Sequence, residues 1–264
     1  MSYRGKYRNP LRDGLERAIG SLKPDLIVLT EYLTKPDVHE DFTEQLRTLG
    51  LRYSALSVED CNENRVSIAA KTTMQENSPT EDWGVLSARS NYLSVHLPAL
   101  GINLIGLRVP FYSGECTSEQ RDYFRSAYGD WLQHSLAPFS DTPTIVIGDF
   151  NFDPGKDEST HAWIKSCFTQ KLFAAVDRSD PNAKWFYCSP PGNERSFKSG
   201  SRLDHALISR SLAEPISSRY ISKKDGFIFL ADHRASDHAA FEFEIGINTA
   251  LASGHDLNDA ASAG

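Results

Sequence analysis

Polar side chains stand at the points where several strand-like stretches of this sequence stop. Four short motifs carry them, and these are VLTEYL, IGDFNFDP, SRLDHALIS and ASDHAAF. The residues concerned are Glu31, Asp149, Asn151, Asp204, Asp237 and His238. Each motif alone is a weak signal, because an aspartate after a strand is more often a turn former than a catalyst. Read as parts of one site, the motifs combine carboxylate, amide and imidazole groups.

This combination of groups is what the cleavage of a phosphate ester requires. Carboxylate oxygens hold Mg²⁺, which keeps several waters and shares its remaining coordination with substrate oxygens. The cation neutralises charge that develops on the phosphoryl group, while a carboxylate orients or deprotonates the attacking water. An imidazole adds hydrogen bonding to the oxyanion or the leaving group. The motifs therefore predict metal-assisted hydrolysis, provided that the fold brings them together.

The motif IGDFN also predicts its own local geometry. Asp149 and Asn151 are two positions apart, so both side chains point to one face if the strand continues through them. Phe150 then points to the opposite face. Gly148 lets the backbone pass close to a ligand or to a neighbouring strand. We expect this strand to aim two polar groups at one site and to bury the phenyl ring behind them.

Apolar spacing predicts the elements that position these residues. A helix is expected to end near Leu22, with Asn9 as its N-cap and Pro10 at its first helical position. Further helices are expected at about 36–49, 117–136 and 159–168. Strand-like runs lie at 26–29, 52–58, 65–73, 91–99, 102–110, 144–151, 184–189, 201–209, 217–222 and 238–245.

The order of these elements indicates an α/β fold. Four runs between residues 52 and 110 follow so closely that they suggest an antiparallel meander. Strand clusters interleaved with helices suit two packed mixed β-sheets with helices outside each. No linker or repeat divides the body, so we expect one domain over residues 1–247. The small, polar segment 248–264 is expected to be a disordered tail.

Composition fits a globular protein and leaves phosphate-bearing substrates open. The chain has 264 residues, 40% of them hydrophobic and 24% charged, with a net charge of −7. This acidic balance argues mildly against a broad basic face, although carboxylates that bind a cation would themselves lower the count. Four cysteines form no C-x-x-C pair, and no apolar run nears the roughly 18 residues of a membrane span. We expect a cytoplasmic monomer with no membrane association.

At these motifs the chain resembles the endonuclease/exonuclease/phosphatase superfamily, which includes DNase I-like nucleases, apurinic/apyrimidinic endonucleases, inositol polyphosphate 5-phosphatases and sphingomyelinases. The resemblance runs from about Asn9 to Ile245 and rests on the ordered set PDLIVLTE, GDFN, SRLDHALIS and SDH. It implies a four-layer α/β/β/α sandwich of two mixed β-sheets and hydrolysis of a phosphoester with a divalent metal. The cofactor would be Mg²⁺, with Mn²⁺ as an alternative. Glu31 would be the principal metal ligand, with Asp237 at or near the metal.

The resemblance also implies catalytic roles for the other motif residues. Asp149 would orient the attacking water, and Asn151 would hydrogen-bond the phosphate or support Asp149. His238 would be the catalytic imidazole, oriented by Asp204. Such an Asp–His pair has a physical rationale of its own, since a carboxylate on one ring nitrogen fixes the tautomer and favours imidazolium. A structural salt bridge is the alternative reading of this pair.

The amino-terminal segment departs from the family pattern. The family opens with a strand that ends in an Asn just before the first helix, whereas this sequence begins almost at that helix. We interpret Asn9 as the helix N-cap rather than as that Asn. Either a first strand is missing from this sequence or this branch dispenses with it. A missing strand would leave a less stable fold and a weaker catalyst.

The segment GLRVPFYSGE is a second departure. Many relatives have a catalytic His after this strand, and the exonuclease-like ones have a Tyr. This sequence offers Arg108 and Tyr112 instead, and we take both as substrate-binding candidates. Arg108 can hold a phosphate through its planar fork or form a surface ion pair. Tyr112 is expected to form a wall of the substrate site or to pack internally.

These observations favour a phosphodiesterase, and a nuclease in particular, with nucleic acid as the phosphate-ester substrate. A phosphomonoesterase acting on a phosphorylated small molecule or lipid fits the same residues, because selectivity resides in loops. A catalytically weakened binding module of the same fold is the remaining alternative. The joint presence of Glu31, Asp149, Asn151, Asp204 and His238 favours an enzyme, since a binding module has no chemical need of them.

Overall fold

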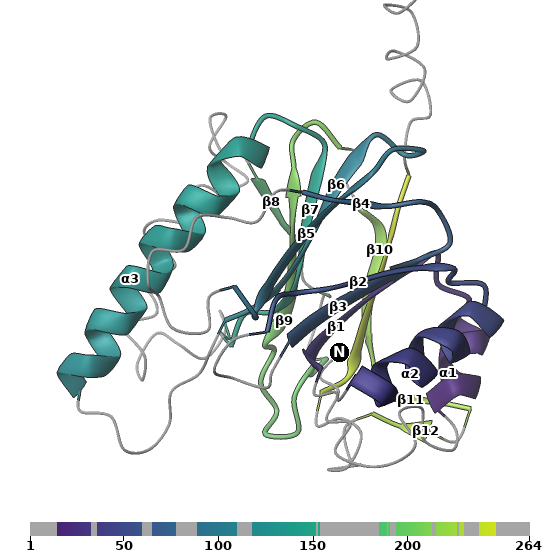
Figure 1. The fold of residues 1–264 in the computed structure, drawn as a ribbon. Coiled ribbons are helices and arrows are strands. Elements are labelled where there is room, and N and C mark those ends of the chain that lie inside the picture. The colour runs from purple at the N-terminus through teal and green to yellow at the C-terminus, as the bar shows by residue number, and fades with distance from the viewer. Residues whose placement is uncertain are drawn as a thin grey trace, which may run out of the picture.

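The structure is a computed structural model (Figure 1). It describes residues 15–32, 36–59, 65–77, 89–109, 118–151, 153, 185–188, 190, 194–212, 215–225, 227–229 and 238–246. Several expectations lie outside these residues and are not tested by it. They concern Asn9, Tyr112, Asp237, the helix expected at 159–168 and the tail 248–264.

A six-stranded mixed sheet forms the centre of the described structure. Its order is β4-β5-β6-β7-β9-β8. The strands are β4 (Gln75–Glu76), β5 (Tyr92–Leu97), β6 (Ile102–Arg108), β7 (Thr144–Asp149), β8 (Trp185–Cys188) and β9 (Asp204–Ser209). β6 and β7 pair in parallel, while β7 and β9 are antiparallel. A parallel pair needs a crossover connection, and this one contains helix α3 (Ser118–Leu136) and the short 3₁₀ helix η1 (Ala137–Phe139).

The remaining described strands are antiparallel and form smaller sheets. The three-stranded sheet has the order β1-β3-β2, while β10 pairs with β13 and β11 with β12. Their bounds are β1 (Leu26–Tyr32), β2 (Tyr53–Leu56), β3 (Arg65–Ala70), β10 (Pro215–Ile221), β11 (Lys223–Lys224), β12 (Phe227–Ile228) and β13 (Ala240–Ile245). The two other helices are α1 (Leu15–Leu22) and α2 (Pro36–Thr48). None of the described helices is long and apolar enough to cross a membrane.

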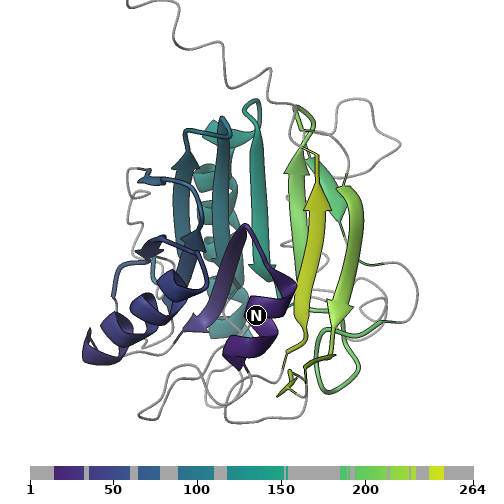
Figure 2. The same cartoon turned by 90° about the vertical axis from the view of Figure 1, so that its right-hand side faces the viewer.

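Three apolar clusters lie between the layers. The first, between α3 and the six-stranded sheet, includes Trp131 and Leu107. The second, between the six-stranded sheet and β3, includes Ile68 and Leu104, and Phe241 of β13 packs against it. The third includes Phe42 of α2 and lies against β1. Helix α3 therefore covers one face of the six-stranded sheet, while β1, β3 and β13 cover the other, with α1 and α2 beyond them (Figures 1 and 2).

Most elements that the apolar spacing predicts within the described residues are confirmed, but the antiparallel meander is wrong. β2 and β3 pair with each other in one sheet, and β5 and β6 pair in the other. β3 pairs with β1 on its second edge. From Val66 to Ala70 its residues are buried, so this strand requires neighbours on both edges and covered faces. Strand spacing along the chain does not reveal such a change of sheet.

Gly106 of β6 allows the sheets to approach closely. A Cβ added there would lie 2.6 Å from Val66 Cγ1 and 3.0 Å from Val28 Cγ1. We expect Gly106→Ala to lower the free energy of unfolding by about 1–3 kcal/mol, because overpacking forces shifts in a filled core. Urea denaturation measures this change. The matched control is Gly246→Ala, whose Cβ would meet Ile216 Cδ1 at an ordinary 3.7 Å. Equal stability of the two variants would contradict the close packing.

Candidate active site

Three adjacent strands bring three of the predicted residues side by side. Arg108 of β6 is opposite Asp149 of β7, and Asp149 is opposite Asp204 of β9. Residues that are directly opposite on neighbouring strands point to the same face of a sheet. All three are buried, Asp149 and Asp204 to a relative exposure of 1% each. The sheet register thus places the cationic side chain of Arg108 beside two carboxylates on the face that meets β1 and β3.

The IGDFN motif turns back on itself where β7 ends. The backbone of Asn151 is left-handed, with φ +50°, so the strand does not continue through it as the alternation argument required. Its backbone N–H donates to Asp149 Oδ1 at 2.8 Å, and its Nδ2 donates to Asp149 Oδ2 at 3.1 Å. Asn adopts this conformation more readily than most residues. Phe150 is buried in the α3 cluster, on the face that the sequence predicts.

Gly148 is required by a neighbouring strand. A Cβ added to it would lie 1.8 Å from the carbonyl oxygen of Leu107 in β6. The sequence allows two reasons for this glycine, the close passage of a ligand or that of a neighbouring strand. The structure shows the neighbouring strand. The glycine therefore permits the tight β6–β7 pairing that sets Arg108 beside Asp149.

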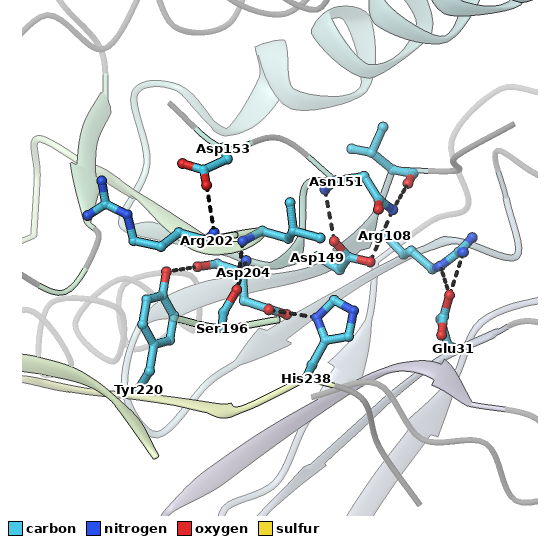
Figure 3. Close-up of polar contacts among 12 residues, drawn as sticks. Glu31, Arg108, Asp149, Asn151, Asp153, Ser196, Arg202, Asp204, Tyr220 and His238 are labelled. Carbon is cyan, nitrogen blue, oxygen red and sulfur yellow. Dashed lines mark hydrogen bonds and ion pairs between the residues drawn. The ribbon is translucent and has the colours of Figure 1, made fainter. Parts of the chain in front are cut away.

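The buried imidazole of His238 lies beside the two carboxylates. His238 Nδ1 lies 2.7 Å from Asp204 Oδ2 (Figure 3). Burial is the strongest influence on His238 and lowers its pKa, but Asp204 and Asp149 together raise the pKa to about 9. Burial raises the pKa of Asp204, whereas His238 lowers it further, so the net shift is downward. Both effects favour an imidazolium–carboxylate pair at neutral pH.

The pKa of Asp149 is shifted in the opposite direction from that of Asp204. Burial first, and then the charges of Asp204 and Glu31, raise its pKa to about 6, against the opposing effects of His238 and Arg108. A carboxylate with a pKa near neutrality is a more effective proton acceptor than an ordinary one. Two neighbouring carboxylates are therefore driven apart in pKa, a pattern that commonly separates base and acid functions in active sites.

Glu31 forms a buried ion pair with Arg108. Its Oε1 accepts hydrogen bonds from Arg108 Nε at 3.0 Å and Nη2 at 2.5 Å. The backbone of Glu31 is left-handed, with φ +52°, and lies where the β1–β3 register shifts between Leu29 and Tyr32. This irregularity positions the side chain against Arg108. The sequence alternatives for Arg108 were a phosphate contact or a surface ion pair, and the pair found is buried.

Sequence reasoning missed the residues that hold this arrangement. The hydroxyl of Ser196 accepts hydrogen bonds from the backbone N–H of Leu203 at 2.6 Å and of Asp204 at 3.2 Å. The Ser196 carbonyl accepts the N–H of Ala239 at 2.6 Å. Tyr220 donates its hydroxyl to the Asp204 carbonyl at 2.6 Å. These residues tie the start of β9 to the segment that carries His238, and no periodicity or motif marks them in the sequence.

The His238–Asp204 pair predicts a pH dependence of stability. Because folding raises the pKa of His238 from 6.5 to about 9, its stabilising contribution is complete below pH 6.5 and is lost as the pH rises through about 9. The loss should be on the order of 3 kcal/mol. Urea unfolding between pH 6 and 10 should show it in the wild type. His238→Gln should flatten this part of the curve, whereas His96→Gln, which removes a half-buried histidine bonded to Asn103, should not.

The donor set at this position fits a divalent cation. Asp149 and Asp204 each offer a carboxylate oxygen, and these oxygens and a ring nitrogen of His238 lie within 4.8 Å of one another. The carboxylates are the ligands, because His238 as an imidazolium has no lone pair to offer. Asp204 Oδ1 is buried and has no hydrogen-bond partner among the described residues. Carboxylate oxygens are the ligands that Mg²⁺ and Mn²⁺ prefer. The sequence resemblance implies Glu31 and Asp237 as metal ligands. Glu31 acts electrostatically on Asp149, and Asp237 lies outside the described residues.

Comparison with solved structures identifies the fold. An AP endonuclease from Archaeoglobus fulgidus aligns over 93% of this chain and 98% of its own, with 16% identity and a TM-score of 0.69. The 3′ phosphatase NExo from Neisseria, solved with a product DNA hairpin, aligns over 88% and 93%, with 17% identity and a TM-score of 0.61. The 3′-5′ exonuclease NExo from Neisseria meningitidis aligns over the same shares, with 16% identity and a TM-score of 0.57. The likeness establishes a DNase I-like fold.

Sequence comparison gives the family. A search of curated protein sequences finds no match to this chain. The sequence profile described as the endonuclease/exonuclease/phosphatase family matches residues 3–238, which include every motif residue discussed above. The ordered motifs at Glu31, Asp149, Asp204 and His238 all fall within that match. The chain belongs to the endonuclease/exonuclease/phosphatase family.

Proposed function

We propose that this protein is a divalent-metal-dependent phosphodiesterase, and specifically a nuclease. The observation that carries the proposal is the buried group of Asp149, Asp204 and His238, whose carboxylate oxygens and ring nitrogen lie within 4.8 Å of one another. A module that only binds a partner has no reason to bury two carboxylates and an imidazole together, because burying charge is costly. We also propose that the complete protein forms the four-layer α/β/β/α sandwich.

The proposed mechanism assigns a task to each side chain. A bound Mg²⁺ or Mn²⁺, held by carboxylates of this group, would neutralise charge on the phosphoryl oxygens. Asp149 orients the attacking water and accepts its proton, as its pKa of about 6 allows. Asn151 donates to both oxygens of Asp149 and so fixes the orientation of the carboxylate. His238, kept protonated by Asp204, donates a hydrogen bond to a phosphoryl oxygen or to the leaving oxygen.

Basic residues in the loop that packs against the imidazole support a nucleic acid as the substrate. The loop before β9 carries Arg195, Lys198 and Arg202, and the first two are exposed. The same loop brings Phe197 against His238, with ring centroids 4.8 Å apart. Cationic side chains of this kind bind phosphates along a nucleic acid backbone. The NExo structure that contains a product DNA hairpin makes DNA the first substrate to test.

A phosphomonoesterase is the alternative function. The same side chains serve a phosphorylated small molecule or lipid, because the chemistry at phosphorus needs the same base, imidazole and cation. The NExo structure is described as a 3′ phosphatase, so a monoester at a DNA end is a substrate class that belongs in the comparison. Relative turnover of diesters and monoesters discriminates the two functions.

One assay panel tests the proposal. The purified protein is incubated with Mg²⁺, Mn²⁺ or EDTA and with plasmid DNA, abasic DNA, RNA, a generic phosphodiester and a phosphomonoester. We expect metal-dependent diester cleavage that EDTA abolishes and that Asp149→Ala and His238→Ala both lose. The matched control is Asp25→Asn, an exposed carboxylate bound to Lys71 just before β1, which should keep full activity. Turnover of monoesters alone would support the alternative, and no turnover of any substrate would refute the enzyme.

A further inference from the structure

Glu31, which the sequence resemblance implies as a metal ligand, already has a cationic side chain against it. Arg108 places two of its N–H groups on a single oxygen of Glu31, Oε1. Both side chains are about nine-tenths buried, with relative exposures of 10% for Arg108 and 8% for Glu31. Figure 3 shows the Arg108 side chain reaching from the side of Asp149 towards Glu31. Any divalent cation that uses this oxygen must contend with the guanidinium.

The backbones of both residues are fixed, so an exchange of partners falls to the side chains. The N–H of Arg108 donates to the carbonyl of Asn91 at 2.9 Å. The carbonyl of Arg108 accepts the hydroxyl of Tyr128 at 3.2 Å. Glu31 lies in β1 at the register shift, in the opposite layer. An exchange of partners by the guanidinium would break its bonds to Glu31 and its Nη1 contact with Asn91 Oδ1, at 3.4 Å, and would leave the backbone hydrogen bond of Arg108 in place.

The geometry of the pair favours such an exchange. The guanidinium of Arg108 lies on Glu31 Oε1, and Arg108 is opposite Asp149 in the β6–β7 register. A divalent cation that used Glu31 would therefore lie beside a buried guanidinium, and like charges repel strongly in a buried site. Departure of the guanidinium from Glu31 relieves this repulsion. A guanidinium and a divalent cation at this carboxylate therefore oppose each other.

We propose that Arg108 competes with the divalent cation for Glu31 and thereby sets the metal affinity of the site. This inference rests on the proposed metal-dependent function and adds a regulating residue to it. Arg108 also neutralises the buried charge of Glu31, and loss of that neutralisation would destabilise the fold. The site is consequently stable without the divalent cation, and its affinity for that cation is lower.

Metal binding without turnover provides the main test. Isothermal titration with Mn²⁺ should show Arg108→Gln binding at least about tenfold more tightly than the wild type, within the usual range of coupling between two ligands. Glu31→Gln should bind more weakly than the wild type. The control is Arg219→Gln, which removes the exposed Arg219–Glu242 pair between β10 and β13 and should leave the affinity unchanged. Equal or weaker binding by Arg108→Gln overturns the proposal.

A second measurement uses the wild-type protein and remains available if Arg108→Gln does not fold. The Nε–H resonance of Arg108 is identified as the arginine signal that disappears in Arg108→Lys. During a Mg²⁺ titration, this signal should shift and lose its protection from solvent exchange at the concentration that half-saturates the site. A signal that stays in place at Mg²⁺ saturation would show that the guanidinium does not leave Glu31, and the competition would be refuted.

The outcomes separate this inference from the proposed function. Tighter Mn²⁺ binding by Arg108→Gln in a protein that hydrolyses none of the substrates supports the competition and refutes the enzyme. Metal-dependent hydrolysis with equal Mn²⁺ affinities supports the enzyme and refutes the competition. If neither the wild type nor Arg108→Gln binds Mn²⁺ or Mg²⁺, both proposals fail.

Discussion

Replacing Asp149 with Asn is expected to lower kcat/KM for the preferred phosphoester by about a thousandfold or more, in the range typical of a lost general base. An amide cannot accept the proton of the attacking water. It also presents a donor where Asp149 now accepts two hydrogen bonds from Asn151. The measurement is steady-state kinetics under saturating Mg²⁺, with thermal unfolding to show that the variant is folded.

The pH profile gives an independent check on Asp149. With its pKa at about 6, wild-type kcat/KM should rise as the pH increases through that value, because the carboxylate must be deprotonated to accept a proton. The rise should be absent from the residual activity of Asp149→Asn. Asp25→Asn, altered at an exposed carboxylate, should keep both the rate and the profile. Retention of more than about a tenth of the activity by Asp149→Asn would remove it from the reaction.

Replacing His238 with Gln or Asp204 with Asn should each lower kcat by about a hundredfold to ten-thousandfold. The two side chains are joined at 2.7 Å and act as one imidazolium–carboxylate pair. Removing either member destroys the pair, so the double variant should be no slower than the slower single variant. Kinetics of the two single variants and the double variant measure this non-additivity. Losses that multiply would show that the residues act separately.

The alkaline limb of the pH profile distinguishes positioning from folding. In the wild type, activity should fall as the pH rises through about 9, where His238 loses its proton. Asp204→Asn removes the charge that raises the pKa of His238, so the fall should begin at lower pH. A merely destabilised protein would lose activity without this displacement. His96→Gln, bonded to Asn103 at the opposite end of the strands, provides the matched control.

The sequence was most informative where local physics decides the structure. Helix α2 and the later part of α3 follow from apolar spacing, and the buried face of Trp131 and Leu132 agrees with it. The burial of Phe150 follows from alternation along β7. Asp149, Asp204 and His238 converge because each lies at or beside a strand end, as their motifs indicate. Asp149 and Asp204 lie at ends of adjacent strands of the six-stranded sheet, and His238 lies just before β13 of the neighbouring sheet, so the motifs predicted their positions at strand ends but not their register.

The remaining features depend on contacts between segments distant in sequence. The register that sets Asp149 opposite Asp204 has no local signature. The left-handed backbone of Glu31 and its bond to Arg108 arise only when β1 meets β6 across two layers. Ser196 is a single serine in a polar loop, and its role depends on the position of the β9 backbone. The spacing of apolar residues in a sequence reveals which face of a helix or strand is buried. It does not reveal contacts between polar side chains on different strands.

The parallel pairing of β6 and β7 and the position of His238 affect how the protein is made. Contacts between residues far apart along a chain form slowly during folding. During translation the chain emerges from its amino terminus, so Asp149 and Asp204 leave the ribosome before the imidazole that pairs with Asp204. A nascent chain that ends after β9 therefore carries carboxylates but no His238. The proposed hydrolase should therefore be inactive during translation, while it is close to its own messenger RNA, until the segment that carries His238 has emerged.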